Sequence, residues 1–153
     1  MGSAIINFII NGAIAWAIYR PMAAVPIWGE RSIAGDTFST AFLLPFFVCL
    51  IVTPLTRRKV RRGEIPALCW RRVSHPVLGR LPSSSILRAL VFGIFCAISV
   101  ASFTVFALGA LGVNEMALLP FLTFKSTFAA ILAGVVAPVS ARLALGDSCV
   151  AEP

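Results

Sequence analysis

The sequence predicts an all-α integral membrane protein, built as a four-transmembrane-helix bundle of two tandem helical hairpins. Of its 153 residues, 59% are hydrophobic and only 12% are charged, whereas soluble domains contain about 25% charged residues. So few charges could not cover the surface of a water-soluble domain. The apolar residues also gather in four runs, and a membrane-spanning helix needs roughly 17–25 such residues.

The first span is expected over about residues 4–22. Its apolar run, Ala4–Tyr19, is short for a complete span, so we expect the helix to extend towards Met22. A cleaved signal peptide is the alternative interpretation. Against it, no lysine or arginine precedes the run, and no good small-residue cleavage site follows it. We therefore expect a retained helix.

The second span is expected over residues 38–56, which completes a first hairpin over residues 1–56. A connector from Arg20 to Thr37 precedes the span, and its prolines and glycines predict turns. Asp36 falls in this connector, so no predicted span contains a carboxylate. The phenylalanines of the second span predict a helix that faces lipid.

A basic loop is expected over residues 57–85. The stretch from Arg57 to Arg88 holds nine of the 13 basic residues and a single acid, Glu64. Cations close to an anionic membrane surface contribute about 1 kcal/mol each, although the charge could act only as a topology signal. The candidate contacts for anionic lipid headgroups are Arg57, Arg58, Lys59, Arg61, Arg62, Arg71 and Arg72.

The second hairpin is expected over residues 86–145, with spans over about 86–110 and 118–143. Serines at 83–85 are suited to cap its first helix, and the glycines between Gly109 and Asn114 predict the end of that helix. The last span is rich in alanine and glycine, which favours a central position or an oligomer contact. Residues 146–153 are expected to form a mobile cytoplasmic tail.

The basic loop also predicts orientation. Cytoplasmic loops of membrane proteins carry an excess of lysine and arginine, so residues 57–85 should face the cytoplasm. Because four spans separate the two ends of the chain, both termini should then be cytoplasmic as well. The predicted location is the inner, or plasma, membrane of a bacterium, with the chain crossing it several times.

The two halves share a pattern that indicates a parallel internal repeat. Gly12 in the first span corresponds to Gly93 in the third (93 − 12 = 81), and Pro54 in the second corresponds to Pro138 in the fourth (138 − 54 = 84). Two halves with one orientation would be related by a pseudo-twofold axis along the membrane normal. Chance similarity between apolar segments is the alternative.

Three polar side chains inside the predicted spans are candidates for lining a pathway. Asn7 and Asn11 are four residues apart and so share a helix face, where an interhelical hydrogen bond is the alternative role. Lys125 is the one strongly ionised group well inside an apolar run. Its long side chain could instead reach the outer interface, towards Glu115 or Asp36.

No motif for catalysis or nucleotide binding occurs in the sequence. The four cysteines form no Cys-x-x-Cys pair and His75 is the single histidine, so we expect neither a metal site nor a disulfide framework. Catalytic residues and cofactors are likewise not expected. The net charge of +7 points to anionic lipid and not to nucleic acid, because the chain is so apolar.

The function predicted from these features is non-catalytic. The chain is interpreted as a structural, accessory or lipid-interacting protein, alone or within a homo-oligomer or a larger membrane complex. The alternative is a small oligomeric transporter or channel for a small solute. An enzyme acting on lipid headgroups ranks last, because the sequence offers no plausible pair of nucleophile and base.

Overall fold

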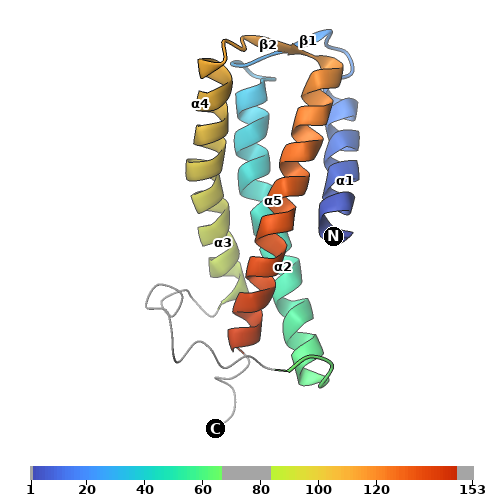
Figure 1. Ribbon diagram of the computed structural model, residues 1–153, viewed down its shortest axis with the longest axis vertical. Helices are drawn as coiled ribbons and strands as arrows, with labels where there is room; N and C mark the ends of the chain where they lie inside the picture. Colours follow the sequence, from blue (N-terminus) through green and yellow to red (C-terminus); the bar gives the residue numbers. More distant parts are fainter. Residues whose placement is uncertain (1, 67–83, 148–153) are drawn as a thin grey trace.

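The structure is a computed structural model that describes residues 2–66 and 84–147, and four long helical rods stand side by side in it (Figure 1). All four are long and apolar enough to cross a membrane. The predicted class, an all-helical protein with four membrane-length helices, is therefore confirmed. The rods are α1 (Gly2–Tyr19), α2 (Ile33–Arg61), the continuous rod of α3 (Ser85–Cys96), a π-helical turn (Ala97–Ala101) and α4 (Ser102–Ala110), and α5 (Leu118–Asp147).

Helix α2 is longer at both ends than the sequence indicated. It begins at Ile33 because Ser32 caps it, and the backbone N–H of Gly35 donates a hydrogen bond of 3.2 Å to the Ser32 Oγ. It continues to Arg61, so the first residues of the expected basic loop are helical. Cations in the last turn of a helix interact favourably with its negative end, and this contributes to the extension.

Two short strands were not expected from the sequence. β1 (Ala24–Pro26) and β2 (Glu115–Ala117) pair in antiparallel fashion, with Val25 opposite Met116. This ribbon crosses one end of the bundle and joins the two connectors on that side (Figure 1). The connectors were expected to hold turns and a short link, because three residues are too few to show the alternation that marks a strand.

Helices α2 and α5 form the centre of the bundle. They pack against each other, α1 packs against α5, and α3 packs against α2. The central position expected for the last span is confirmed, whereas the prediction that the second span faces lipid is wrong. One face of α2 is buried along its length, from Thr37 through Ala41 and Pro45 to Cys49 and Thr53, and these small side chains let the neighbouring helices approach closely.

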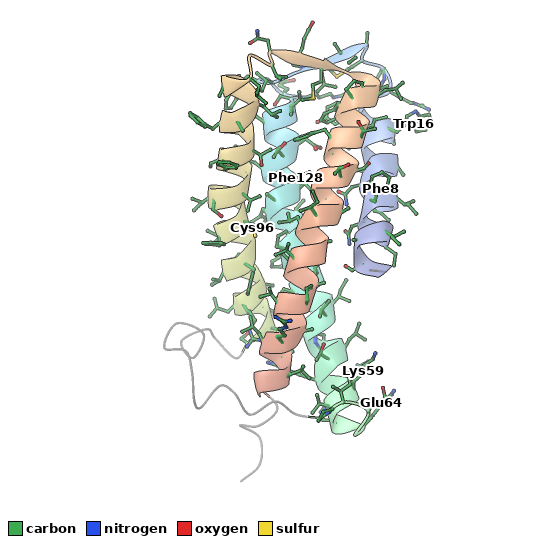
Figure 2. The ribbon with its side chains drawn as sticks, viewed as in Figure 1. Phe8, Trp16, Lys59, Glu64, Cys96 and Phe128 are labelled. Atoms are coloured by element: carbon green, nitrogen blue, oxygen red, sulfur yellow. The ribbon has the colours of Figure 1, made fainter. Side chains whose placement is uncertain are left out.

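Two apolar clusters fill the interior. The larger one joins α2, the rod of α3 and α4, and α5, and the other lies beneath the ribbon. Large apolar side chains also cover the outer surface of the rods (Figure 2). The bundle is therefore apolar inside and outside. The first cluster contains Ala41, Leu44, Cys96, Ala101, Ala129, Leu132, Ala133 and Val136, and the second contains Ala15, Tyr19, Val25, Ile27, Ile33, Leu108 and Phe121.

Candidate functional site

A buried ion pair joins the two central helices near the ribbon. The Lys125 Nζ on α5 contacts the Asp36 Oδ1 on α2, and the two side chains are only 5% and 12% exposed. Asp36 lies in the first turn of α2, where the partial positive charge of the helix end favours a carboxylate. Each charge is therefore held in place by a partner of the opposite sign.

The ion pair places Asp36 and Lys125 in environments that differ from those expected from the sequence. Asp36 was expected in a connector but lies in the first turn of α2, because the helix starts early, at the Ser32 cap. Lys125 is buried and pairs with Asp36, while Glu115, the other partner considered, is exposed. A capping serine followed by an acidic residue in the first turn is typical of a helix N-terminus, and this signal could have located Asp36 in the helix.

Several buried hydroxyl groups lie on the two helices that carry the ion pair. Thr37 is buried, and its Oγ1 donates a hydrogen bond of 2.7 Å to the carbonyl oxygen of Ile33. Thr40 and Ser126 are buried nearby along the same two helices. The interior at the ribbon end therefore contains these polar groups beside the second apolar cluster.

The two asparagines of α1 make local contacts. Asn7 Nδ2 donates a hydrogen bond of 2.8 Å to the carbonyl oxygen of Ser3, and Asn11 Nδ2 donates one of 3.0 Å to the carbonyl oxygen of Asn7. Both side chains are half-buried. Within the described residues, neither asparagine makes a hydrogen bond to Lys125. The three candidate pathway residues are thus on α1 and α5 but are not joined in one polar site.

A π-helical turn interrupts the third rod at Ala97–Ala101. The turn packs against α2, and Ala101 is fully buried. The Thr104 Oγ1 that follows it donates a hydrogen bond of 2.7 Å to the carbonyl oxygen of Val100. Turns of this kind are rare and often occur at functional sites. The sequence pattern gave no sign of the π-helical turn at Ala97–Ala101.

The end of α2 that is remote from the ribbon carries the basic residues. Arg58, Lys59, Arg61 and Arg62 are exposed there, and Figure 2 shows Lys59 and Glu64 at this end of α2. Arg57 is half-buried, and its Nη1 donates a hydrogen bond of 3.3 Å to the Ser85 Oγ. The other two candidate lipid contacts, Arg71 and Arg72, lie outside the described residues.

Arg88 is a residue whose environment the sequence did not indicate. It was grouped with the basic stretch, but it lies in the first turns of α3 and is fully buried. Its position separates it from the exposed cations of α2. Among the described basic residues of this end, those of α2 are exposed or half-buried, Arg142 on α5 is exposed, and Arg88 on α3 is buried.

In the ranges 2–66 and 84–147, no group of three or more histidine, cysteine, aspartate or glutamate side chains could hold a metal ion. Comparisons with protein-family models, with curated proteins and with solved structures find no match to this chain. The features available for a functional inference are therefore the buried ion pair, the basic end of α2 and the ribbon.

Proposed function

We propose that the protein is a non-catalytic structural or accessory protein of a bacterial inner membrane, and that it binds anionic lipid at the cytoplasmic face. The observation that carries this proposal is the difference between the two ends of the bundle. At one end α2 presents Arg58, Lys59, Arg61 and Arg62, whereas the ribbon end carries nearly balanced charge from Arg20, Arg31, Glu30, Asp36 and Glu115.

The charge difference also supports an orientation. Positive loops favour the cytoplasmic side, so the basic end of α2 is proposed to be cytoplasmic and the ribbon to face outwards. The N-terminal end of α1 and the C-terminal end of α5 both point away from the ribbon (Figure 1). Both termini would then be cytoplasmic, as expected for four crossings.

A parallel internal repeat is part of the proposal, and close helix contacts support it. A Cβ added to Gly12 on α1 would lie 2.6 Å from the Ser126 Oγ on α5, and one added to Gly93 on α3 would lie 2.9 Å from the Phe42 carbonyl oxygen on α2. Gly93 follows Gly12 by 81 residues (93 − 12), and Ser126 follows Phe42 by 84 (126 − 42). These are the offsets that the sequence pattern gave.

The burial pattern gives independent support for the repeat. In α2 every fourth residue from 37 to 49 is buried, and in α5 every fourth residue from 121 to 133 is buried, an offset of 84 (121 − 37). Each hairpin also packs its first helix against the second helix of the other hairpin. The matching buried residues are Thr37, Ala41, Pro45 and Cys49 in α2, and Phe121, Lys125, Ala129 and Ala133 in α5.

The interior favours an accessory role over transport. The Lys125 ammonium is neutralised by Asp36, so it does not present an unpaired charge to a solute. Ala129 and Ala133 of α5 are fully buried in an apolar cluster further along the helix. A pathway along the centre of one copy would have to displace this packed cluster.

The lipid role is tested by removing two cations from either end. We expect Arg58→Gln with Arg61→Gln to weaken binding of phosphatidylglycerol about 30-fold, since each cation near the surface contributes about 1 kcal/mol. Arg20→Gln with Arg31→Gln removes the same charge from the ribbon end and should have little effect. Native mass spectrometry of each purified double variant measures its affinity for phosphatidylglycerol, with net-neutral phosphatidylcholine as the reference lipid. Equal losses in the two variants would rule out a specific basic end.

The alternative function is a small oligomeric transporter or channel. The π-helical turn at Ala97–Ala101 and the buried Lys125–Asp36 pair favour it, because such turns often occur at functional sites and ionisable groups inside membrane segments often mark ion or substrate pathways. Reconstitution into vesicles loaded with fluorescent indicators for protons or small ions distinguishes the two functions. A flux that the matched variant Asp36→Asn abolishes, while folding is retained, would replace the accessory role with transport.

A further inference from the structure

The register of the ribbon determines which backbone groups it leaves free. The N–H of Ile27 donates to the Asn114 carbonyl oxygen at 2.8 Å, and the N–H of Leu118 donates to the Ala23 carbonyl oxygen at 3.3 Å. In this register the pairs of Ala117 with Ala24 and of Glu115 with Pro26 are of the non-hydrogen-bonded kind, in which the N–H and C=O groups point away from the partner strand.

The two edges of the ribbon are therefore unequal. On β2 both Glu115 and Ala117 direct an N–H outwards, and neither N–H makes a hydrogen bond to another residue of the described part of the chain. On β1 the corresponding residues are Pro26, which has no N–H, and Ala24. Proline on an edge strand hinders pairing with a further strand, because it has no N–H to donate. The edge of β2 therefore keeps two outward N–H groups, whereas the edge of β1 keeps only that of Ala24.

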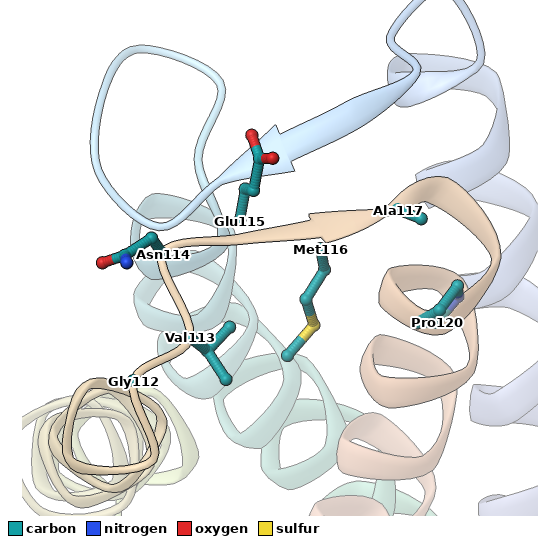
Figure 3. Close-up of a pocket in the computed structure, with 7 residues that line it drawn as sticks. All are labelled: Gly112, Val113, Asn114, Glu115, Met116, Ala117 and Pro120. Atoms are coloured by element: carbon teal, nitrogen blue, oxygen red, sulfur yellow. The ribbon is translucent and has the colours of Figure 1, made fainter.

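A hollow of about 600 Å³ borders β2. Figure 3 shows that the side chains of Val113 and Met116 point into the space between the ends of α4 and α5, whereas Glu115 points to the opposite side of the strand. Glu115 is exposed and makes no ion pair with a described residue. The hollow is lined by Gly112, Val113, Asn114, Glu115, Met116, Ala117 and Pro120.

We propose that the free edge of β2 binds an extended segment of a partner protein as a third strand of the ribbon. Strand addition of this kind obtains affinity from main-chain hydrogen bonds and specificity from alternating side chains. An apolar side chain of the segment would cover Met116 and Val113, and a lysine or arginine on its other face would meet the Glu115 carboxylate. This partner binds at the end opposite to the basic residues of α2, so the proposal does not depend on lipid binding.

The test uses the full chain in detergent and an acetylated peptide of alternating lysine and valine as the probe. Ala117→Pro removes one outward N–H of β2, and Ala24→Pro makes the same change at its cross-strand neighbour on the other edge. We expect Ala117→Pro to weaken peptide binding about three- to tenfold, the contribution of one hydrogen bond, and Ala24→Pro to leave it unchanged. Isothermal titration calorimetry measures both affinities. Equal affinities for the two proline variants would overturn the proposal.

A modified peptide makes the test independent of variant folding. N-methylation of alternate backbone nitrogens removes ladder donors without changing any side chain, and it should abolish binding to the unmodified protein. Glu115→Gln should weaken binding, whereas Glu30→Gln, at another exposed acid of the same end, should not. Binding of the N-methylated peptide would show that charge attraction alone holds it, and this would overturn the proposal. Failure of the unmodified peptide to bind would overturn it as well. So would a dimer of the chain that Ala117→Pro dissociates, because the free edge would then bind a second copy.

Discussion

The interface between α2 and α5 differs between its ribbon end and its middle. Near the ribbon, Asp36 and Lys125 form a buried ion pair, with the buried Thr37 and Ser126 as neighbours in the two helices. In the middle the contact is made by small apolar residues, of which Ala129 is fully buried. One pair of helices thus uses a directional polar contact and a non-directional apolar contact within a few turns.

The ion pair and the apolar middle constrain the two helices in different ways. Small side chains let two helices come close, but an apolar surface of alanines tolerates sliding and rotation. A buried ion pair is satisfied in one relative position only, and its net contribution to stability is small because both charges lose their hydration. We infer that the middle sets the distance between α2 and α5, and that the ion pair sets their register.

Removing one partner of the ion pair should have the largest effect. Lys125→Met leaves the Asp36 carboxylate buried without its cation, and breaking a buried pair in this way costs about 3–5 kcal/mol. Asp36→Leu combined with Lys125→Met replaces both charges by apolar groups and should recover most of that loss. Unfolding of the purified protein in increasing sodium dodecyl sulfate measures both variants. A double variant as unstable as the single one would contradict the small net contribution of the pair to stability.

Overpacking the middle should have the next largest effect. Ala133→Leu adds a large side chain where α5 is fully buried, and overpacking of a tight core typically costs about 1–3 kcal/mol. Val135→Leu adds volume two residues away at an exposed position and should change the free energy of unfolding by less than about 0.5 kcal/mol. Similar values for the two variants in the same unfolding assay would show that the middle is not closely packed.

The sequence predicted the four spans because the length and apolarity of a run are properties of the run itself. It missed the first turn of α2, since the polar residues Ser32 and Asp36 depress local hydropathy although Ser32 caps the helix and Asp36 lies in its first turn. It also assigned α2 to the lipid on the evidence of its phenylalanines. The burial of that helix depends instead on the small residues of its other face, such as Ala41 and Cys49.

The candidate site was predictable only in part, because it depends on contacts between distant segments. Lys125 was identified as the strongly ionised residue inside an apolar run, and Asp36 was one of the two partners considered for it. Their pairing requires α2 and α5 to be neighbours, which no property of either run specifies. The ribbon was missed for the same reason, since Val25 and Met116 become strand residues only when the two connectors meet.

The two close glycine contacts of the proposed repeat should respond unequally. In Gly93→Ala the added Cβ would meet the Phe42 carbonyl oxygen at 2.9 Å, and the backbone cannot move aside easily, so we expect a loss of about 1–2 kcal/mol. In Gly12→Ala the Cβ would meet the Ser126 Oγ at 2.6 Å, and this hydroxyl can rotate. The loss should be smaller and should vanish in Gly12→Ala with Ser126→Ala. Thermal unfolding in detergent compares the variants, and a larger loss at Gly12 would contradict this order.

The smallest effect is expected at the cap that brings Asp36 into the helix. Ser32→Ala removes the acceptor for the Gly35 N–H, and loss of a serine cap costs about 1 kcal/mol. The matched control is Ser84→Ala, because Ser84 occupies the same position before α3 but its side chain makes no capping hydrogen bond. If the cap matters mainly because it places Asp36 opposite Lys125, the cost of Ser32→Ala should fall in the Asp36→Leu, Lys125→Met background. If Ser32→Ala costs as much in that double variant as in the unmodified protein, the cap does not act through the ion pair. The register of α2 would then depend on packing alone.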